Sequence, residues 1–297
     1  ILNRAFVGIL NYRKSAVQAG GISSPQRRFN GGILMSQWTQ LFRSGVKTGW
    51  ANLAVELTPV TVLGSRIPRA ILQAVFFILI SYAAGGSELA KFALIGNTMH
   101  AAVFHSIIEM SVVIELEKWL GTMPYLIASP ANWFPTLLGR SLPGYVEGLL
   151  RILLVLLILV PFFGADLTTL ALLRAAPIFI ITVASASALG WLSGAIMLPT
   201  RWGMLACNTI GYLMMITGGV NFPVTALPPI IQWFGRILPM THGLLAIRQV
   251  IDGASYADVS SLIVSEIIIG VIYGMAAWKL FSYRLNVARQ TGNIEKF

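Results

Sequence analysis

The chain has 297 residues, of which 56% are hydrophobic and only 11% are charged. A soluble domain carries charge on about 25% of its residues, so this composition excludes an ordinary soluble globular protein. The formal net charge of +10 would be compatible with nucleic acid, but the basic residues lie in the termini and in particular loops rather than on one soluble face. We therefore expect an integral membrane protein that binds no nucleic acid.

The N-terminal region, residues 1–65, is expected to form a basic cytoplasmic arm followed by a helix on the membrane surface. Residues 1–32 contain five basic side chains (Arg4, Arg13, Lys14, Arg27 and Arg28) and no acidic one. After this arm, apolar residues such as Trp38 recur at about every 3.6 positions, while Arg43 and Lys47 take the other side. This pattern is typical of an amphipathic helix with tryptophan at headgroup depth and cations toward anionic membrane lipid. A soluble helix packed against a partner is the alternative.

Residues 66–297 are expected to form an all-α polytopic domain with six transmembrane helices. A bilayer core is about 30 Å thick, so a helix needs about 20 mainly apolar residues to cross it. The basic residues concentrate in the segments that would lie inside, which places both termini in the cytoplasm of a multi-pass protein of the cell (inner or plasma) membrane. The expected spans are residues 67–86, 89–113, 144–163, 170–198, 203–220 and 259–281.

Between the fifth and sixth spans lies a segment, residues 221–254, that is apolar yet repeatedly broken by proline. Pro239 separates two short apolar pieces, Ile230–Leu238 and Thr241–Ile251. Each piece rises only about 13–17 Å at 1.5 Å per residue, which is too little to cross the membrane. We expect a re-entrant helical hairpin that dips into the outer leaflet and returns, with its broken backbone buried in protein.

The same region resembles a signature of type-2 ABC transporter membrane subunits. That permease family includes daunorubicin-type drug exporters and the O-antigen and teichoic-acid exporters. The shared features are a small-residue pair, F-P, L-P, an aromatic-rich short helix, P-M-T and a final Arg, which here run GGVNFPVTALPPIIQWFGRILPMTHGLLAIRQ. The resemblance implies an ATP-driven exporter that works with two ABC ATPase subunits and a second permease, identical or different. ATP and Mg²⁺ would bind to those ATPases, and no cofactor is expected in this chain, which has no phosphate loop or nucleophile elbow.

In that family, the loop between the second and third spans carries a coupling helix that docks in a groove of the ATPase. The corresponding loop here is residues 114–141, and an ordinary acidic loop is the alternative interpretation. In such docking, charges set the register and apolar side chains anchor the helix. Charge reversal at Glu117 is therefore expected to weaken ATPase association and to leave the fold unchanged. The coupling residues that the resemblance implies are Glu115, Glu117, Trp119, Gly121, Thr122 and Met123.

The resemblance also places the substrate path at the dimer interface, lined by the second and fifth spans and closed outside by the hairpin. Methionine side chains adapt to varied shapes, so their presence there suits an amphipathic or lipid-linked substrate: a drug, lipid or glycolipid. Phe222 and Trp233 lie beside the breaks of the hairpin, where either an outer gate or ordinary packing explains their bulk. The expected path and gate residues are His100, Met214, Met215, Phe222, Trp233 and Glu266.

Ionisable residues inside a membrane are costly and usually face a cavity or a partner. Glu147 and Arg151 are four positions apart and are expected to pair along one helix face. Glu266 has no partner in its own helix, and Arg236 or Arg248 of the hairpin is the candidate. If Glu266 and the histidines of the second span instead carry ions, the chain would be a stand-alone secondary transporter or channel. No metal site is expected, because those histidines do not share a helix face.

Overall fold

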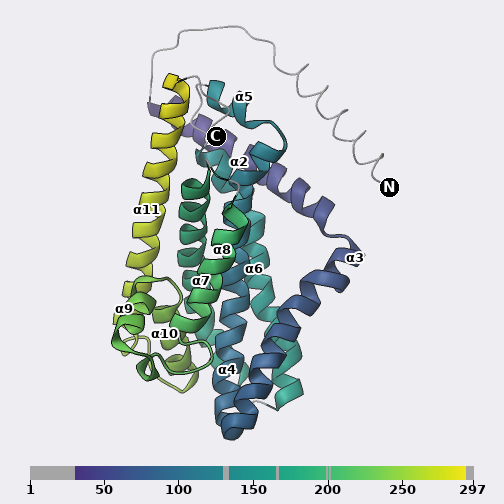
Figure 1. Cartoon of the computed structure of the whole chain (residues 1–297), viewed down its shortest axis with the longest axis vertical. Helices are drawn as coiled ribbons and strands as arrows, with labels where there is room; N and C mark the ends of the chain where they lie inside the picture. Colours follow the sequence, from purple (N-terminus) through teal and green to yellow (C-terminus); the bar gives the residue numbers. More distant parts are fainter. Residues whose placement is uncertain (1–30, 130–133, 165–166, 199, 201, 292–297) are drawn as a thin grey trace. The chain divides into compact units, whose positions relative to one another are not determined.

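The computed structural model describes residues 31–129, 134–164, 167–198, 200 and 202–291. The chain forms two compact units, Ile1–Trp38 and Thr39–Phe297, and all the helices described here belong to the second, apart from the start of α2. Within the described ranges every regular element is a helix, which confirms the all-α class (Figure 1). The predicted basic arm lies outside the described residues, apart from its last two.

The described part of the chain contains both long helices and short helical elements (Figure 1). The long helices are α2 (Gly31–Glu56), α4 (Ile67–Trp119), α6 (Phe134–Phe163), α7 (Thr169–Met197), α8 (Gly203–Thr217) and α11 (Ser260–Thr291). The short elements are α3 (Pro59–Thr61), the π-helical turn η1 (Val62–Arg66), α5 (Met123–Ala128), the 3-10 turn η2 (Val224–Ala226), α9 (Pro229–Ile237) and α10 (Thr241–Ile251). The two short helices predicted on either side of Pro239 are therefore present as α9 and α10.

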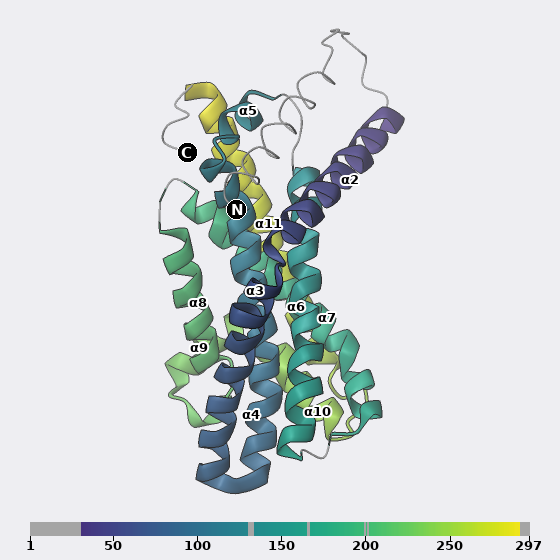
Figure 2. The same cartoon turned by 90° about the vertical axis from the view of Figure 1, so that its right-hand side faces the viewer.

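Helix α4 is folded back on itself at a pair of glycines. Gly85 and Gly86 leave helical geometry, and Gly86 takes φ 71° and ψ −155°, a conformation that glycine adopts without steric cost. Figures 1 and 2 show the two arms of α4 side by side, with their turn at the end opposite α5. The arms correspond to the predicted first and second spans, and the second arm continues as far as Trp119.

Four of the described helical stretches are long and apolar enough to cross a membrane, and α8 is apolar but shorter. In both views α5 and the end of α11 lie at one end of the second unit, here named the α5 end (Figures 1 and 2). The turn of α4 and the helices α9 and α10 lie toward the other end, here named the hairpin end. These findings confirm a multi-pass membrane protein, whereas the count of six crossings stays a prediction. The four stretches are Pro59–Trp119, Phe134–Phe163, Thr169–Met197 and Ser260–Gln290.

The second arm of α4 lies among α6, α7, α8 and α10 and packs against all four. Small residues let the backbones of these helices come close together, as is usual between membrane helices. A Cβ atom on Gly190 of α7 would come within 2.7 Å of the carbonyl oxygen of Ile107, and one on Gly148 of α6 would meet Ser106. The second arm is thus the element against which the other helices are positioned.

Helix α2 is docked on the beginning of α6 through glycines. A Cβ atom on Gly49 would lie 2.6 Å from the carbonyl oxygen of Arg140, and one on Gly139 would lie 2.3 Å from that of Phe42. Gly45, one turn before Gly49, makes the same kind of contact with Thr136. The two glycines four positions apart form the small-residue contact that brings helix backbones together in membranes. The helix is present as predicted, and its location at the membrane surface stays a prediction.

Replacing Gly49 tests this docking. Gly49→Val should lower the free energy of unfolding by about 1–3 kcal/mol, the usual cost of forcing extra methyl groups into a packed contact. Thermal unfolding of the purified protein in detergent would show a lower midpoint. Gly64→Ala is the control, because a Cβ atom at Gly64 meets nothing within 4 Å. Equal midpoints for the two variants would show that the contact contributes nothing.

Candidate functional site

Glu117, near the end of α4, is buried within the chain and joins three elements. The residue is 2% exposed, its carboxylate pairs with the guanidinium of Arg140 on α6, and it accepts a hydrogen bond from the hydroxyl of Thr122. A buried charge of this kind is tolerated because it is paired, and removing the pairing is strongly destabilising. This burial corrects the expectation that charge reversal at Glu117 leaves the fold unchanged, since Glu117→Arg would set two guanidinium groups against each other.

Both ends of α5 are fastened to other helices. Met123 at its start is buried in an apolar cluster that includes Trp191 of α7 and Phe281 of α11. At its end, Arg289 of α11 donates hydrogen bonds to the carbonyl oxygens of Ile127 at 3.0 Å and of Ser129 at 2.8 Å. A basic side chain in this position satisfies the last carbonyl groups of a helix and matches its dipole. Helix α5 is therefore held by α11 and α7 and is not a free loop.

The part of this segment that a partner can reach is aromatic. Trp119 is 80% exposed and Tyr125 is 68% exposed, and Leu120 between them is exposed as well. Gly121 provides the turn between α4 and α5 with a φ of 65°. Glu115 is half-buried, with one carboxylate oxygen fully enclosed. Among the described residues of this segment, the exposed aromatic side chains are the candidates for contact with a partner, and the coupling role of the segment stays a prediction.

Glu266 of α11 is fully buried and caps the beginning of α10. Its two carboxylate oxygens accept hydrogen bonds from the backbone N–H of Met240 at 2.8 Å and of Gly243 at 3.0 Å. A carboxylate in this place satisfies donors that a helix leaves free at its N-terminus and favours the positive end of the dipole. The expectation that Arg236 or Arg248 is its partner is therefore wrong, because the charge is balanced by backbone groups of the hairpin.

Arg248, on α10, secures the other side of the hairpin. Its guanidinium donates hydrogen bonds to the carbonyl oxygens of Gly219 at 2.8 Å, Val220 at 3.0 Å and Phe92 at 3.0 Å. It also lies 3.3 Å from the centre of the Phe92 ring, within the range of a cation–π contact. A Cβ atom on Gly96 would clash with both Val220 and Arg248, which explains why glycine is placed there. Arg248 thus joins the broken chain after α8 to the second arm of α4.

His100 is a hydrogen-bonded structural residue in this arrangement. Its Nε2 atom lies 3.0 Å from the carbonyl oxygen of Gly211 on α8, which can only accept, so this nitrogen carries the hydrogen. Its Nδ1 atom lies 3.4 Å from the amide nitrogen of Gln73, and its ring stacks on that of Phe104. His100 therefore links both arms of α4 to α8.

The remaining predicted path and gate residues divide between interior and surface. Met214 is fully buried, and the sulfur of Met215 lies 3.8 Å from the amide nitrogen of Gln73. Phe222 and Trp233 are exposed at the hairpin end, as bulky gate residues would be. Their role as a gate stays a prediction. Met214 can line a path only after a rearrangement that exposes it.

A second group of charges surrounds Glu147 on α6. Its carboxylate lies 3.1 Å from Arg151, which confirms the predicted pair, and it also pairs with Arg66. Arg66 reaches Glu56 at the end of α2 at 2.6 Å, and His105 lies 3.4 Å from Glu147. Sequence reasoning missed these further partners, because they come from α2, η1 and the second arm of α4.

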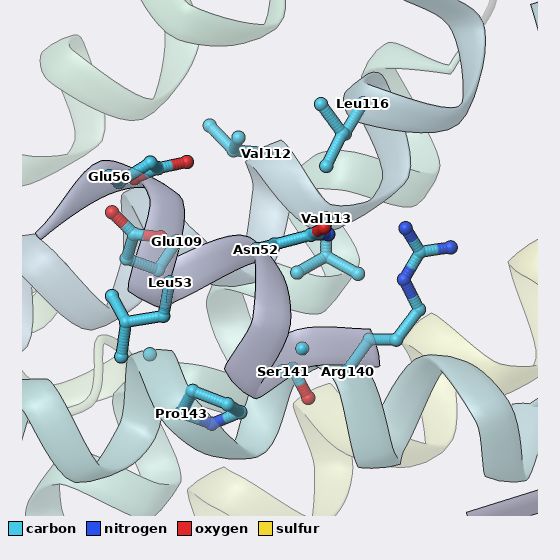
Figure 3. Close-up of a pocket in the computed structure, with 12 residues that line it drawn as sticks. Asn52, Leu53, Glu56, Glu109, Val112, Val113, Leu116, Arg140, Ser141 and Pro143 are labelled. Atoms are coloured by element: carbon cyan, nitrogen blue, oxygen red, sulfur yellow. The ribbon is translucent and has the colours of Figure 1, made fainter. Parts of the chain in front are cut away.

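Figure 3 shows a pocket between α2, the second arm of α4 and α6. Glu56 and Glu109 lie close together on one side of it, and Arg140 lies on the other. Its volume of about 50 Å³ admits water and is too small for a drug or lipid. We therefore regard it as a hydrated gap beside the charged groups and not as a substrate site.

Comparison with known proteins adds one finding. The sequence model of the ABC-2 type transporter family matches residues 34–251, a range that includes α5 and the hairpin. The search of curated proteins finds no match.

The cap on α10 gives a direct test of the hairpin. Glu266→Ala removes the acceptor for two buried N–H groups, and each unsatisfied group costs about 1–3 kcal/mol. We expect a lower thermal unfolding midpoint in detergent and faster proteolysis of the hairpin. Glu88→Ala, an exposed residue beside the turn of α4, is the control. Unchanged behaviour of the Glu266 variant would show that packing alone holds the hairpin.

Proposed function

Because the chain belongs to the ABC-2 type transporter family and is a permease subunit of an ABC transporter, we propose that it exports an amphipathic or lipid-linked substrate. Membership in the family implies association with ABC ATPase subunits. We propose two copies of the ATPase and a second permease, identical or different, with ATP and Mg²⁺ bound to the ATPases. The observation that carries the proposal is that α11 is bonded to the exposed aromatic segment at one end and to the broken hairpin at the other.

The proposed topology has six crossings, made by the two arms of α4 and by α6, α7, α8 and α11. In this arrangement α9 and α10 do not cross, because their nine and eleven residues rise only about 14 and 17 Å. The hairpin end then faces outward, and the α5 end faces the cytoplasm. Support comes from the two views, in which α9 and α10 lie toward the same end as the turn of α4.

The proposed coupling step begins at α5. When ATP draws the two ATPases together, their movement displaces the segment that carries Trp119 and Tyr125. Helix α11 then moves with α5, because Arg289 holds the last carbonyl groups of α5. Since Glu266 lies 23 residues earlier on the same helix, about 35 Å away, the displacement reaches the N-terminus of α10. A rigid helix bonded at both ends can thus convert an event at the ATPase into opening of the outer hairpin.

The proposed substrate route runs along the interface with the second permease. Apolar side chains of α8 stay open among the described residues, with Met204, Tyr212 and Leu213 about half exposed. Phe222 and Trp233 lie beyond it at the hairpin end and would close the route outside. An apolar route closed by aromatic side chains fits an amphipathic cargo better than an ion.

The alternative of a stand-alone secondary transporter or channel needs a titratable group free to exchange ions. Glu266 already accepts two backbone hydrogen bonds, and both nitrogens of His100 have partners. These contacts argue against an ion path through either residue. Export by this chain without any ATPase would favour the alternative.

Single-cysteine labelling tests the topology. In a Cys207→Ala background, we expect a membrane-impermeant maleimide added outside to label Ser255→Cys, in the exposed loop before α11. The same reagent should label Tyr283→Cys, exposed near the other end of α11, only after the membrane is opened. Labelling of Tyr283→Cys in sealed cells would contradict the six-crossing arrangement.

Truncating the exposed aromatic pair tests the coupling. Loss of an aromatic anchor at an interface typically costs about 2 kcal/mol or more, so Trp119→Ala with Tyr125→Ala should weaken ATPase association about 30-fold or more. Co-purification and substrate-stimulated ATP hydrolysis would report the loss, with the thermal midpoint of the permease unchanged. Tyr82→Ala, an exposed aromatic residue of the first arm of α4, is the control. Full association of the double variant would place the docking surface elsewhere.

A further inference from the structure

A second and larger cavity lies between the two arms of α4 and α6. Its volume is about 170 Å³, well above the roughly 10–15 Å³ that a cavity needs to admit one water molecule. Five of its eleven lining residues carry side-chain nitrogen, and one carries a carboxylate. The lining residues that matter here are Arg66, Arg69, Gln73, His105, Glu109 and Arg151.

Two of the three arginines are held in place by carboxylates outside the lining. Arg66 and Arg151 both pair with Glu147, and Arg66 also pairs with Glu56. Such charge-assisted contacts fix the guanidinium groups before any ligand arrives, which lowers the cost of binding. The Nε atom of Arg151 is buried and has no hydrogen-bond partner in the described part of the chain. The cavity therefore offers preorganised donors for an anion.

Arg69 differs from the other two. Among the described residues it has no ion pair and no hydrogen bond, and its guanidinium lies 5.6 Å from the centre of the Phe104 ring. A cation in a membrane helix is costly unless something neutralises it. The described part of the chain supplies no anion for Arg69, which leaves its guanidinium open to a partner from the surroundings.

The same face of the first arm of α4 is apolar beyond Arg69. Leu72, Phe76 and Leu79 follow at helical spacing and are all more than half exposed. A cation followed by an exposed apolar stripe matches a molecule with an anionic head and a hydrocarbon tail.

We propose that this cavity binds the headgroup of an anionic membrane phospholipid, with an acyl chain along Leu72, Phe76 and Leu79. Arg69 provides the charge that the headgroup neutralises, and the fixed Arg66 and Arg151 provide further donors. The assignment to the inner leaflet rests on the proposed topology, because Arg69 lies near the start of the first span. The binding chemistry depends on neither that topology nor the export function.

Lipid retention by the full chain tests the proposal. The protein is reconstituted with equal amounts of phosphatidylglycerol and phosphatidylcholine, and the lipids that stay bound in detergent are counted by native mass spectrometry. We expect phosphatidylglycerol to be retained preferentially and Arg69→Gln to lower its retention about five-fold, the equivalent of about 1 kcal/mol for one basic side chain. Arg69→Lys should keep most of the preference. The thermal midpoint of Arg69→Gln should match the wild type, because Arg69 is exposed and unpaired.

Lys279→Gln is the matched control, since Lys279 is an exposed cation on α11. An equal loss with this variant would mean diffuse attraction of anionic lipid and would overturn the proposal. Equal retention of the two lipids by the wild type would do the same. Inorganic phosphate at the concentration of phosphatidylglycerol should not displace it, because the ion has no tail to contact the apolar stripe. Full displacement would assign the cavity to free phosphate.

Discussion

A buried polar backbone group that has no hydrogen-bond partner costs free energy, and the broken segment between α8 and α11 is where this chain meets that constraint. The backbone leaves helical geometry after Thr217 and again before Thr241. Glu266 satisfies the N–H groups that open there, and Arg248 satisfies carbonyl groups. Each charge is balanced by oriented peptide groups and not by an opposite charge. The two residues come from different helices, so the broken segment also determines how α11, α10 and α4 meet.

Helix α11 connects the hairpin to α5 at the other end of the second unit. Glu266 and Arg289 lie on the same helix, and each bonds to the backbone of a short helix, α10 and α5 respectively. A hydrogen bond to a backbone group weakens steeply when its distance or angle changes. A displacement of one bonded helix is therefore passed on to the other. The physical basis for the proposed coupling between α5 and α10 is therefore that both are hydrogen-bonded to the same helix, α11.

Hydropathy and proline placement predicted the long helices and the two short hairpin helices, because these signals are local in the sequence. The i,i+4 pair of Glu147 and Arg151 was predicted for the same reason. The partner of Glu266 could not be predicted, since it is two backbone N–H groups, which no residue pattern marks. The burial of Glu117 could not be predicted from the sequence either, because its partner Arg140 comes from another helix. The four-residue spacing of Gly45 and Gly49 is a local sequence signal for close helix packing, but a hydropathy profile does not detect it.

An ionisable residue within a membrane is usually the first candidate for a functional site. In this chain that rule separates two kinds of charge. Glu266 and Arg248 are enclosed and matched by groups of the protein, so their charge maintains the fold, and moving it would break the packing around it. Arg69 is exposed, and the described part of the chain provides it with no counter-charge. The two kinds of charge therefore differ in whether the described protein groups neutralise them. A charge that they leave without a partner is the one that an external anion can stabilise by binding.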